Sequence, residues 1–285
     1  MNLRGRLAPT PTGLLHVGHA RTFALAAARA GGAGLVMRIE DLDRARCRAE
    51  FATAALDDLR WLGLSWTEGP DVGGPHGPYR QSERTDWFLD VWRRLEETGA
   101  IYPSPHSRRD VEAAAMAPHE AAAEGESIFP AALRPARRER AALPGGVPWR
   151  FRVPDGRTIT FQDAIQGSVR RTAGVDFGDF VVWRRDDLAA YELAVVADDH
   201  AMEIAEVVRG ADLLTSTARQ ILVCEALGWQ PPAFCHAPLV CDACGQRLAK
   251  RAGAASIRQL RAAGRSPHEI LSAALVVTES DRRPG

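Results

Sequence analysis

The sequence predicts an α/β fold built on a parallel sheet with crossover helices. Through the first hundred residues, short apolar runs that favour strands alternate with stretches whose apolar residues recur at helical spacing. The run at 35–39, LVMRI, is apolar and partly β-branched, as expected of a strand buried on both faces. At 285 residues the chain can form one large α/β domain or two modest ones. The alternation of strand and helix favours parallel pairing.

The first half is expected to contain two strands and three helices. Residues 3–8 form the first strand, and an Ala-rich helix follows from about 19 to 29. After the strand at 35–39, apolar residues at helical spacing predict a helix that stops at Gly63. A further helix is expected at 82–98, since a glycine follows it.

Strand patterns return in the second half. They occupy TITF (158–161), VDFGDFVVWRR (175–185), YELAVVADD (191–199) and EVVRGADLL (206–214). A helix capped by Ser216 and ended by Gly228 is expected next. Residues 234–253 then predict a β-hairpin that leads into a Gly-flanked basic loop, and one more helix follows Ser256.

Composition excludes few classes of function. The 36 basic and 36 acidic residues give a formal net charge of zero, so no overall charge attracts nucleic acid or a membrane surface. We expect neither a signal peptide nor a membrane span, and five scattered cysteines do not suggest a disulfide framework. These observations predict a cytoplasmic protein.

The stretch HVGH, residues 16–19, places two imidazoles where a helix begins, directly after the first strand. Ligands of open parallel sheets bind at the carboxyl ends of strands, and a helix N-terminus attracts phosphate. His16 and His19 can donate hydrogen bonds to a phosphoryl group under attack, and Gly18 lets a nucleotide approach the backbone. By itself this motif also fits ordinary surface or core histidines.

Several motifs together carry a family resemblance. GRLAPTPTGLLHVGHAR is followed by RIEDLD, and later by YRQSER, YELAVVADD and VVRGADLL. In this order and spacing they resemble class I glutamyl-type aminoacyl-tRNA synthetases, to about Leu271. The resemblance implies a Rossmann-type catalytic domain with an inserted subdomain and a short helical C-terminal segment.

The family resemblance also implies a division of the chain. Residues 1–100 and 186–240 are expected to be the two halves of the catalytic domain. Residues 101–185 are the inserted acceptor-type subdomain, which begins with an Ala-, Pro- and Arg-rich stretch of weak periodicity. The signature loop and a helical tail are expected at 241–285. Since 35 residues follow Lys250, we expect no anticodon-binding domain. In this the chain looks like the glutamyl-queuosine tRNA(Asp) synthetases, a paralogous family.

That resemblance implies a two-step reaction. ATP, with Mg²⁺ on its phosphates, activates L-glutamate as glutamyl-adenylate, and glutamate is then transferred to the queuosine base in the anticodon of tRNA(Asp). It further implies that activation needs no tRNA, whereas conventional glutamyl enzymes require theirs. The expected partners are glutamate and queuosine-containing tRNA(Asp), the expected state is a monomer, and no membrane is involved.

The resemblance assigns the site residue by residue. Arg6 and Arg209 match positions that hold the substrate, and a guanidinium fork suits a carboxylate. Glu40 matches the residue that faces the α-ammonium, and Tyr191 matches a tyrosine of the pocket wall. The loop around the amino acid is formed by Ala8, Pro9 and Thr10. Taken singly, each of these also fits an ordinary surface or core residue.

ATP is expected to contact His16, Gly18 and His19, with His16 and His19 also assigned catalytic roles. The signature loop, RLAKR at 247–251, departs from the lysine-rich pattern of the family. Lys250 matches the catalytic lysine and Arg247 keeps a positive charge, but Ala249 lacks the usual hydroxyl. As an isolated pentapeptide it also fits a basic surface loop.

Zinc is expected to be absent from the family's usual position. Ser104 and His106 stand where two cysteines would begin the site, and serine is a poor zinc ligand. A second set of possible ligands, Cys235, His236, Cys241 and Cys244, stays open, although Cys235 and His236 would point to opposite faces of a strand.

Residues 134–152 hold six arginines against one glutamate and include Trp149 and Phe151. This segment fits a surface that follows tRNA phosphates and stacks on a base, or equally a solvated basic face with two core aromatics. Three other functions remain open. They are a truncated conventional glutamyl-tRNA synthetase, a nucleotidyltransferase that shares the HxGH fold, and a non-catalytic RNA- or nucleotide-binding relic.

Overall fold

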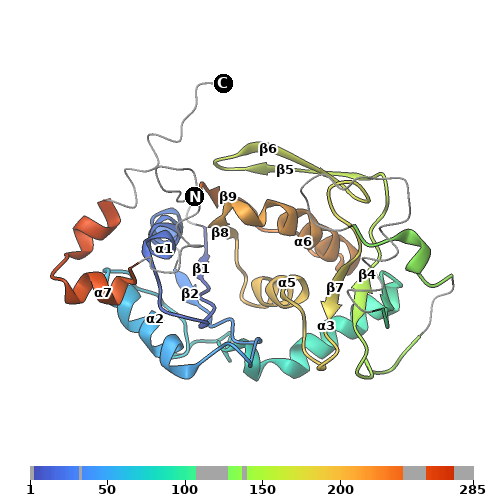
Figure 1. Ribbon diagram of the computed structural model, residues 1–285, viewed down its shortest axis with the longest axis horizontal. Coiled ribbons are helices and arrows are strands. Elements are labelled where there is room, and N and C mark those ends of the chain that lie inside the picture. Colours follow the sequence, from blue (N-terminus) through green and yellow to red (C-terminus); the bar gives the residue numbers. More distant parts are fainter. Residues whose placement is uncertain (1–2, 32–33, 107–127, 137–139, 240–254, 273–285) are drawn as a thin grey trace. The chain divides into compact units, whose positions relative to one another are not determined.

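The computed structural model describes residues 3–31, 34–106, 128–136, 140–239 and 255–272 (Figure 1). The chain forms two compact units, each of which is assembled from separate stretches of sequence. The first unit comprises Met1–Glu83, Met202–Leu213 and Pro232–Gly285. The second comprises Arg84–Ala201 and Leu214–Pro231. The domain boundaries expected from the sequence stay predictions.

Parallel strands form the centre of the first unit. Strand β1 (Gly5–Leu7) pairs in parallel with β2 (Leu35–Met37), and β8 (Glu206–Gly210) pairs in parallel with β9 (Ala233–Ala237). The Arg4 carbonyl oxygen accepts hydrogen bonds from the amides of Ala205, at 2.8 Å, and Glu206, at 3.2 Å. Strand β1 therefore lies between β2 and β8, and the predicted parallel pairing is confirmed.

Three helices accompany these strands: α1 (Val17–Ala30), α2 (Ala49–Trp61) and α7 (Ile257–Ala262). Gly63 follows α2 with φ +85°, a conformation that favours glycine, so the predicted stop is confirmed. The helix predicted after Ser256 is α7, and Ser256 caps it. The core joins strands and helices through Leu7, Met37, Leu59, Val208, Cys235 and Ile257.

The second unit contains the helices α3 (Thr85–Thr98), α5 (Tyr191–Ala201) and α6 (Leu214–Leu227). Helix α3 ends at Gly99 in the left-handed conformation, as its sequence predicts.

A three-stranded antiparallel sheet also belongs to the second unit, in the order β3-β4-β7. Its strands are β3 (Ile101–Pro103), β4 (Trp149–Phe151) and β7 (Phe180–Trp183). Strands β5 (Thr158–Asp163) and β6 (Gly167–Thr172) form an antiparallel hairpin. The strand patterns at 158–161 and 175–185 are therefore confirmed in position, although β7 is shorter than the run that predicts it.

The strand predicted at 191–199 is wrong, because these residues lie in helix α5. Every residue from Glu192 to Asp199 is buried, so this stretch has no solvent-exposed face to reveal the helical period. A short apolar helix that is buried all round cannot be told from a buried strand by its pattern alone.

Two further boundaries differ from the sequence predictions. The strand expected at 206–214 ends at Gly210, and a 3₁₀ turn, Ala211–Leu213, leads directly into α6. Ser216 therefore lies inside α6 and does not cap it. Of the predicted hairpin at 234–253, β9 is described, but it pairs in parallel with β8; residues 240–254 lie outside the described part of the chain.

No helix within the described ranges has the length and apolar content needed to span a bilayer.

Candidate functional site

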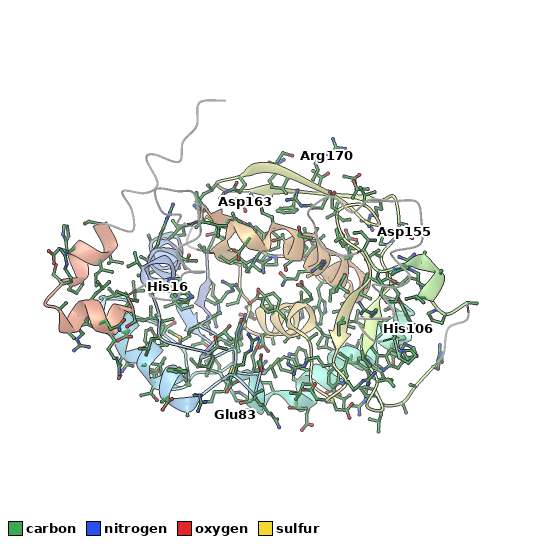
Figure 2. The ribbon with its side chains drawn as sticks, viewed as in Figure 1. His16, Glu83, His106, Asp155, Asp163 and Arg170 are labelled. Atoms are coloured by element: carbon green, nitrogen blue, oxygen red, sulfur yellow. The ribbon has the colours of Figure 1, made fainter. Side chains whose placement is uncertain are left out.

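The first turn of α1 is built around the two histidines of HVGH. His16 is the N-cap residue, with φ −121° and ψ 175°, and its Nδ1 accepts a hydrogen bond from the Gly18 amide at 3.1 Å. His19 Nδ1 accepts from the His16 amide at 3.2 Å, which completes a reciprocal capping box. Figure 2 shows His16 at the start of α1. The sequence analysis assigned these rings to a ligand and missed that they also cap the helix.

These caps fix the tautomer of both rings. A nitrogen that accepts a hydrogen bond carries no proton, so each neutral imidazole holds its proton on Nε2. The ring centroids lie 3.8 Å apart. Burial lowers the pKa of His16; burial and the neighbouring His16 lower the pKa of His19 to about 4. At neutral pH the pair therefore presents two Nε2–H donors and no net charge.

Gly18 occupies a tight position in the same arrangement. A Cβ atom at this position would lie 3.0 Å from His16 Cε1 and 3.1 Å from His16 Nδ1. A side chain here would shift the capping ring by a few tenths of an ångström. The glycine between the histidines therefore protects the position of His16 as well as access to the backbone.

Arg6 and Arg209 lie on the neighbouring strands β1 and β8, and both are buried, with 5% and 4% exposure. Arg6 Nη1 donates to the Val208 carbonyl oxygen at 2.9 Å, and Arg209 Nε donates to His236 Nε2 at 3.1 Å. Burial of a guanidinium group is costly unless hydrogen bonds satisfy it, and these contacts supply part of that compensation.

Glu40 follows β2 and is buried. Its Oε1 accepts from Arg38 Nη2 at 3.0 Å, and its amide donates to the Pro9 carbonyl oxygen at 3.1 Å. Pro9 is buried, Ala8 is half-buried and Thr10 is exposed. The loop that follows β1 is therefore attached to Glu40 by a main-chain hydrogen bond, and the role of these residues in binding a ligand stays a prediction.

Asp41 connects two of the sequence motifs. Its carboxylate accepts hydrogen bonds from the Ser82 amide and the Ser82 hydroxyl, each at 2.8 Å. The Gln81 amide donates to the Ile39 carbonyl oxygen at 3.0 Å. RIEDLD and YRQSER are thus held together through both side-chain and main-chain contacts.

Three expected site residues lie elsewhere or outside the described chain. Tyr191 opens α5 in the second unit and is 40% exposed, so its role in the pocket stays a prediction. Arg247 and Lys250 fall among the residues that are not described. The chain reappears beside His16, which forms a β-bridge with Ser256, and the Ile257 amide donates to the Leu15 carbonyl oxygen at 2.8 Å. Ser256, which comes six residues after Lys250 in the sequence, therefore lies beside the histidine pair.

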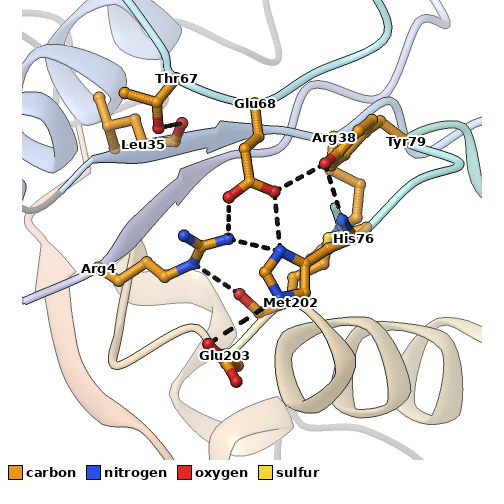
Figure 3. A network of polar contacts seen from close by, with 9 residues as sticks. All are labelled: Arg4, Leu35, Arg38, Thr67, Glu68, His76, Tyr79, Met202 and Glu203. Atoms are coloured by element: carbon orange, nitrogen blue, oxygen red, sulfur yellow. Dashed lines mark hydrogen bonds and ion pairs between the residues drawn. The ribbon is translucent and has the colours of Figure 1, made fainter. Parts of the chain in front are cut away.

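The first unit holds a second polar cluster, drawn in Figure 3, which we call the Glu68 cluster: Arg4, Glu68, His76 and Tyr79. The Tyr79 hydroxyl donates to Glu68 at 2.7 Å, His76 Nδ1 lies 2.9 Å from Glu68, and Arg4 forms an ion pair with it. Burial raises the pKa of Glu68, but the hydrogen bonds from Tyr79, His76 and Arg4 outweigh it and lower that pKa to about 2. The sequence analysis did not predict this cluster.

The positions weighed for zinc do not form a metal site in the described residues. Ser104 is buried, with no hydrogen-bond partner for its hydroxyl, and the ring of His106 lies against Phe129. In the described ranges, no group of three or more His, Cys, Asp or Glu side chains could hold a metal. Cys241 and Cys244 lie outside those ranges, so the absence of zinc stays a prediction.

The aromatic residues of the arginine-rich segment belong to the core. Trp149 is 1% exposed and packs edge-on against Trp92, with 4.8 Å between ring centroids. Phe151 stacks on Phe180 at 5.1 Å. Both side chains therefore belong to the core, as in the interpretation of this segment as a solvated basic face with two core aromatics. The interpretation in which Trp149 and Phe151 stack on an RNA base is wrong.

Comparison with known proteins shows the family of this chain. Residues 2–279 match the family described as tRNA synthetases class I (E and Q), catalytic domain. The Glutamyl-Q tRNA(Asp) synthetase of Symbiobacterium thermophilum is 50% identical over 276 residues, covering 94% of this chain and 84% of that protein. The protein of the same name in Nitratidesulfovibrio vulgaris is 46% identical, with 92% and 82% covered.

A solved structure shows the same fold. The glutamate tRNA ligase of Elizabethkingia meningosepticum, crystallised with its amino acid, is 28% identical, with a TM-score of 0.71 over 93% of this chain and 54% of that one. The family expectation is therefore confirmed, as is the Rossmann-type α/β fold. The chain belongs to the class I tRNA synthetases of the glutamate and glutamine type.

Proposed function

We propose that this chain activates L-glutamate with ATP and transfers it to the queuosine base of tRNA(Asp). The observation that carries the proposal is the neutral histidine pair at the start of α1, in the same unit as the buried Arg6 and Arg209. The histidine pair provides hydrogen-bond donors for phosphate, and the two arginines provide cations for carboxylates. The two relatives named Glutamyl-Q tRNA(Asp) synthetase, at 50% and 46% identity, support the choice of acceptor.

The histidine pair suits a phosphate that gains negative charge during reaction. Nε2–H groups whose rings are held by the helix cap need not reorganise when charge develops, so they stabilise a transition state effectively. In the proposed site, His16 and His19 contact the ATP phosphates beside Gly18, and Arg247 and Lys250 complete the contacts from the signature loop. Mg²⁺ enters with ATP and neutralises phosphate charge.

The amino-acid pocket is proposed to use Arg6, Arg209 and Glu40 of the first unit, with Ala8, Pro9 and Thr10 enclosing the ligand. The guanidinium groups bind the carboxylates of glutamate, and Glu40 faces its ammonium group. Glu40 is already held by Arg38, so its carboxylate is oriented before a ligand binds. Orientation of this kind lowers the entropy cost of reaching the reactive geometry.

The proposed chemistry has two steps. An oxygen of the glutamate α-carboxylate attacks the α-phosphorus of ATP, and the bond to the bridging oxygen breaks as pyrophosphate leaves. A hydroxyl of the queuosine cyclopentene ring then attacks the carbonyl carbon of the mixed anhydride. AMP leaves with the bonding electron pair, the hydroxyl proton is lost, and an ester remains.

Glutamate-dependent ATP–pyrophosphate exchange tests the first step. Purified protein is assayed without tRNA, with glutamate and then with glutamine or aspartate as controls. We expect exchange with glutamate alone. Exchange only after tRNA is added would favour a conventional glutamyl-tRNA synthetase. No exchange under either condition would contradict the proposal and favour a relic that binds RNA or nucleotide.

The acceptor is tested separately. Labelled glutamate is offered with tRNA(Asp) that contains queuosine and with matched tRNA(Asp) that contains guanosine at that position. We expect label only on the first, in the anticodon fragment after nuclease digestion. Charging of a tRNA 3′ end is the second candidate, because a Glutamate--tRNA ligase 2 from Acidithiobacillus ferrooxidans is 44% identical over 272 residues, with 55% of that protein covered. Label at the 3′ end would support this alternative.

A further inference from the structure

We propose that His236 is a positioning residue for glutamate binding, acting through Arg209. This inference rests on the proposed function, in which Arg209 binds a substrate carboxylate. Parallel pairing of β8 with β9 sets Arg209 directly opposite His236. The two side chains meet through Nε of the arginine and Nε2 of the imidazole, 3.1 Å apart. Arg209 is 4% exposed and His236 is fully buried, so water does not compete for this contact.

The chemistry of the two groups fixes the direction of the hydrogen bond. A guanidinium has only donors, so His236 Nε2 accepts and the neutral ring carries its proton on Nδ1. This tautomer is the opposite of that in His16 and His19, whose Nδ1 atoms accept. A neutral acceptor orients the guanidinium without bringing a negative charge of its own. An aspartate or glutamate at this position would compete electrostatically with a substrate carboxylate.

The bond at Nε determines how the guanidinium faces a ligand. A carboxylate binds two N–H groups in the plane of the guanidinium, and rotation about the bond to Nε tilts that plane. Phe234 lies nearby: its ring centroid is 6.0 Å from the Arg209 guanidinium carbon and 6.2 Å from the ring centroid of His236. Arg209 is therefore held by an acceptor on β9, with an aromatic ring of the same strand nearby.

This role differs from the metal ligand that the sequence left open for His236. Its Nε2 is already engaged by Arg209, and Cys235 is adjacent on the strand, where consecutive side chains point to opposite faces. The neighbouring Arg6 is held in a related way, but by the main-chain carbonyl of Val208. Of these two contacts, only the one to Arg209 can be removed by a substitution of its acceptor.

Two variants separate the acceptor from the bulk of the side chain. His236→Met fills similar space without a strong acceptor, whereas His236→Gln offers an amide oxygen at a similar distance from the main chain. In glutamate-dependent exchange, we expect His236→Met to raise the KM for glutamate about tenfold or more, as for loss of a hydrogen bond to a charged group. The kcat and the KM for ATP should stay within about threefold. His236→Gln should restore the KM for glutamate to within about threefold of the parent chain.

A double-mutant cycle tests whether the effect passes through Arg209. Arg209→Lys keeps a charge but lacks Nε, so adding His236→Met to it should change the KM for glutamate less than about twofold. Thermal melting of each variant establishes that it is folded. An unchanged KM for glutamate in His236→Met, an equal rise in the KM for ATP, or additive effects in the cycle would overturn the inference.

Glutamate-dependent exchange by the parent chain distinguishes a failure of this inference from a failure of the proposed function. If it shows no glutamate-dependent exchange, the proposed function fails; if it shows exchange but His236→Met behaves like the parent, only this inference fails. Should the variants not fold, nitrogen NMR of the parent chain labelled on histidine provides the test. We expect a histidine with its proton on Nδ1 whose signals move when glutamate is added. No such histidine would overturn the inference.

Discussion

Two clusters of titratable side chains in the first unit are held in opposite ways. The histidine pair at the start of α1 receives hydrogen bonds only from main-chain amides at its Nδ1 atoms, and burial keeps the rings neutral. The Glu68 cluster pairs charged side chains with one another, and its hydrogen bonds keep the carboxylate ionised.

This difference in hydrogen bonding indicates that the histidine pair can bind a ligand, whereas the Glu68 cluster stabilises the fold. A carboxylate whose oxygens are occupied by Arg4, His76 and Tyr79 has its bonding capacity used within the fold. A histidine that caps a helix through Nδ1 still has an Nε2–H to offer to a ligand. We therefore expect substitutions in the pair to affect activity most, and substitutions in the Glu68 cluster to affect stability most.

Removal of both imidazoles should have the largest effect. In His16→Ala with His19→Ala, we expect the exchange rate at saturating substrate to fall about 10³-fold or more, because loss of one preorganised donor costs about 10²–10³-fold. Steady-state exchange kinetics measure this. A loss of less than about tenfold would mean that the pair does not contact the reacting phosphate.

A matched substitution separates the cap from the donor. Asparagine is a strong N-cap residue but offers no group in place of Nε2–H, so His16→Asn should keep the melting temperature while the exchange rate falls about 10²-fold. Calorimetry and exchange are measured on the same preparation. A variant that melts early and stays active would reverse the assignment of this residue.

Glu68→Gln should give the opposite result. Breaking a buried, paired charge costs about 3–5 kcal/mol, so we expect a loss of unfolding free energy of that order. The exchange rate of the folded variant should stay within about threefold of the parent chain. Urea titration followed by exchange in buffer measures both. A stable variant with a large loss of activity would place Glu68 in the active site.

The pH dependence of stability should show the smallest difference between the histidine pair and the Glu68 cluster, and also the most distinctive one. Unfolded His19 takes up a proton near pH 6.5 but folded His19 does so only near pH 4, so its contribution, up to about 3 kcal/mol, is lost as pH falls from about 6.5 to 4. The contribution of Glu68 is present above pH 4.5 and is lost as pH falls to about 2.

Urea titrations across these two pH windows measure the contributions separately. His19→Ala should reduce the first loss, of which buried His16 retains a part, and keep the second, whereas Glu68→Gln should remove the second and keep the first. A first loss of unchanged size in His19→Ala would contradict the assigned cause.

How far the sequence could predict the site depended on distance along the chain. The motif at the start of α1 places His16, Gly18 and His19 within one helical turn, so the sequence alone could predict that they act together. His236 acts on Arg209 across two strands, 27 residues away, and nothing in the local sequence signals that contact. The Glu68 cluster gathers side chains from separate segments in the same way.

The fold was predictable where elements have one apolar face or a glycine stop. Helix α2 shows both, and its predicted end at Gly63 is confirmed. Helix α5 is buried throughout from Glu192 to Asp199, so no solvent-exposed face marks the helical period. Where tertiary contacts bury every residue of an element, the spacing of apolar residues no longer distinguishes a helix from a strand.

The central claim is that the helix-capping histidines serve the activation of glutamate. The most direct test is tRNA-free, glutamate-dependent ATP–pyrophosphate exchange by the parent chain, His16→Asn and Glu68→Gln, assayed side by side as folded proteins. We predict exchange in the parent chain and in Glu68→Gln, and a loss of about 10²-fold in His16→Asn. Equal exchange by all three would contradict the claim.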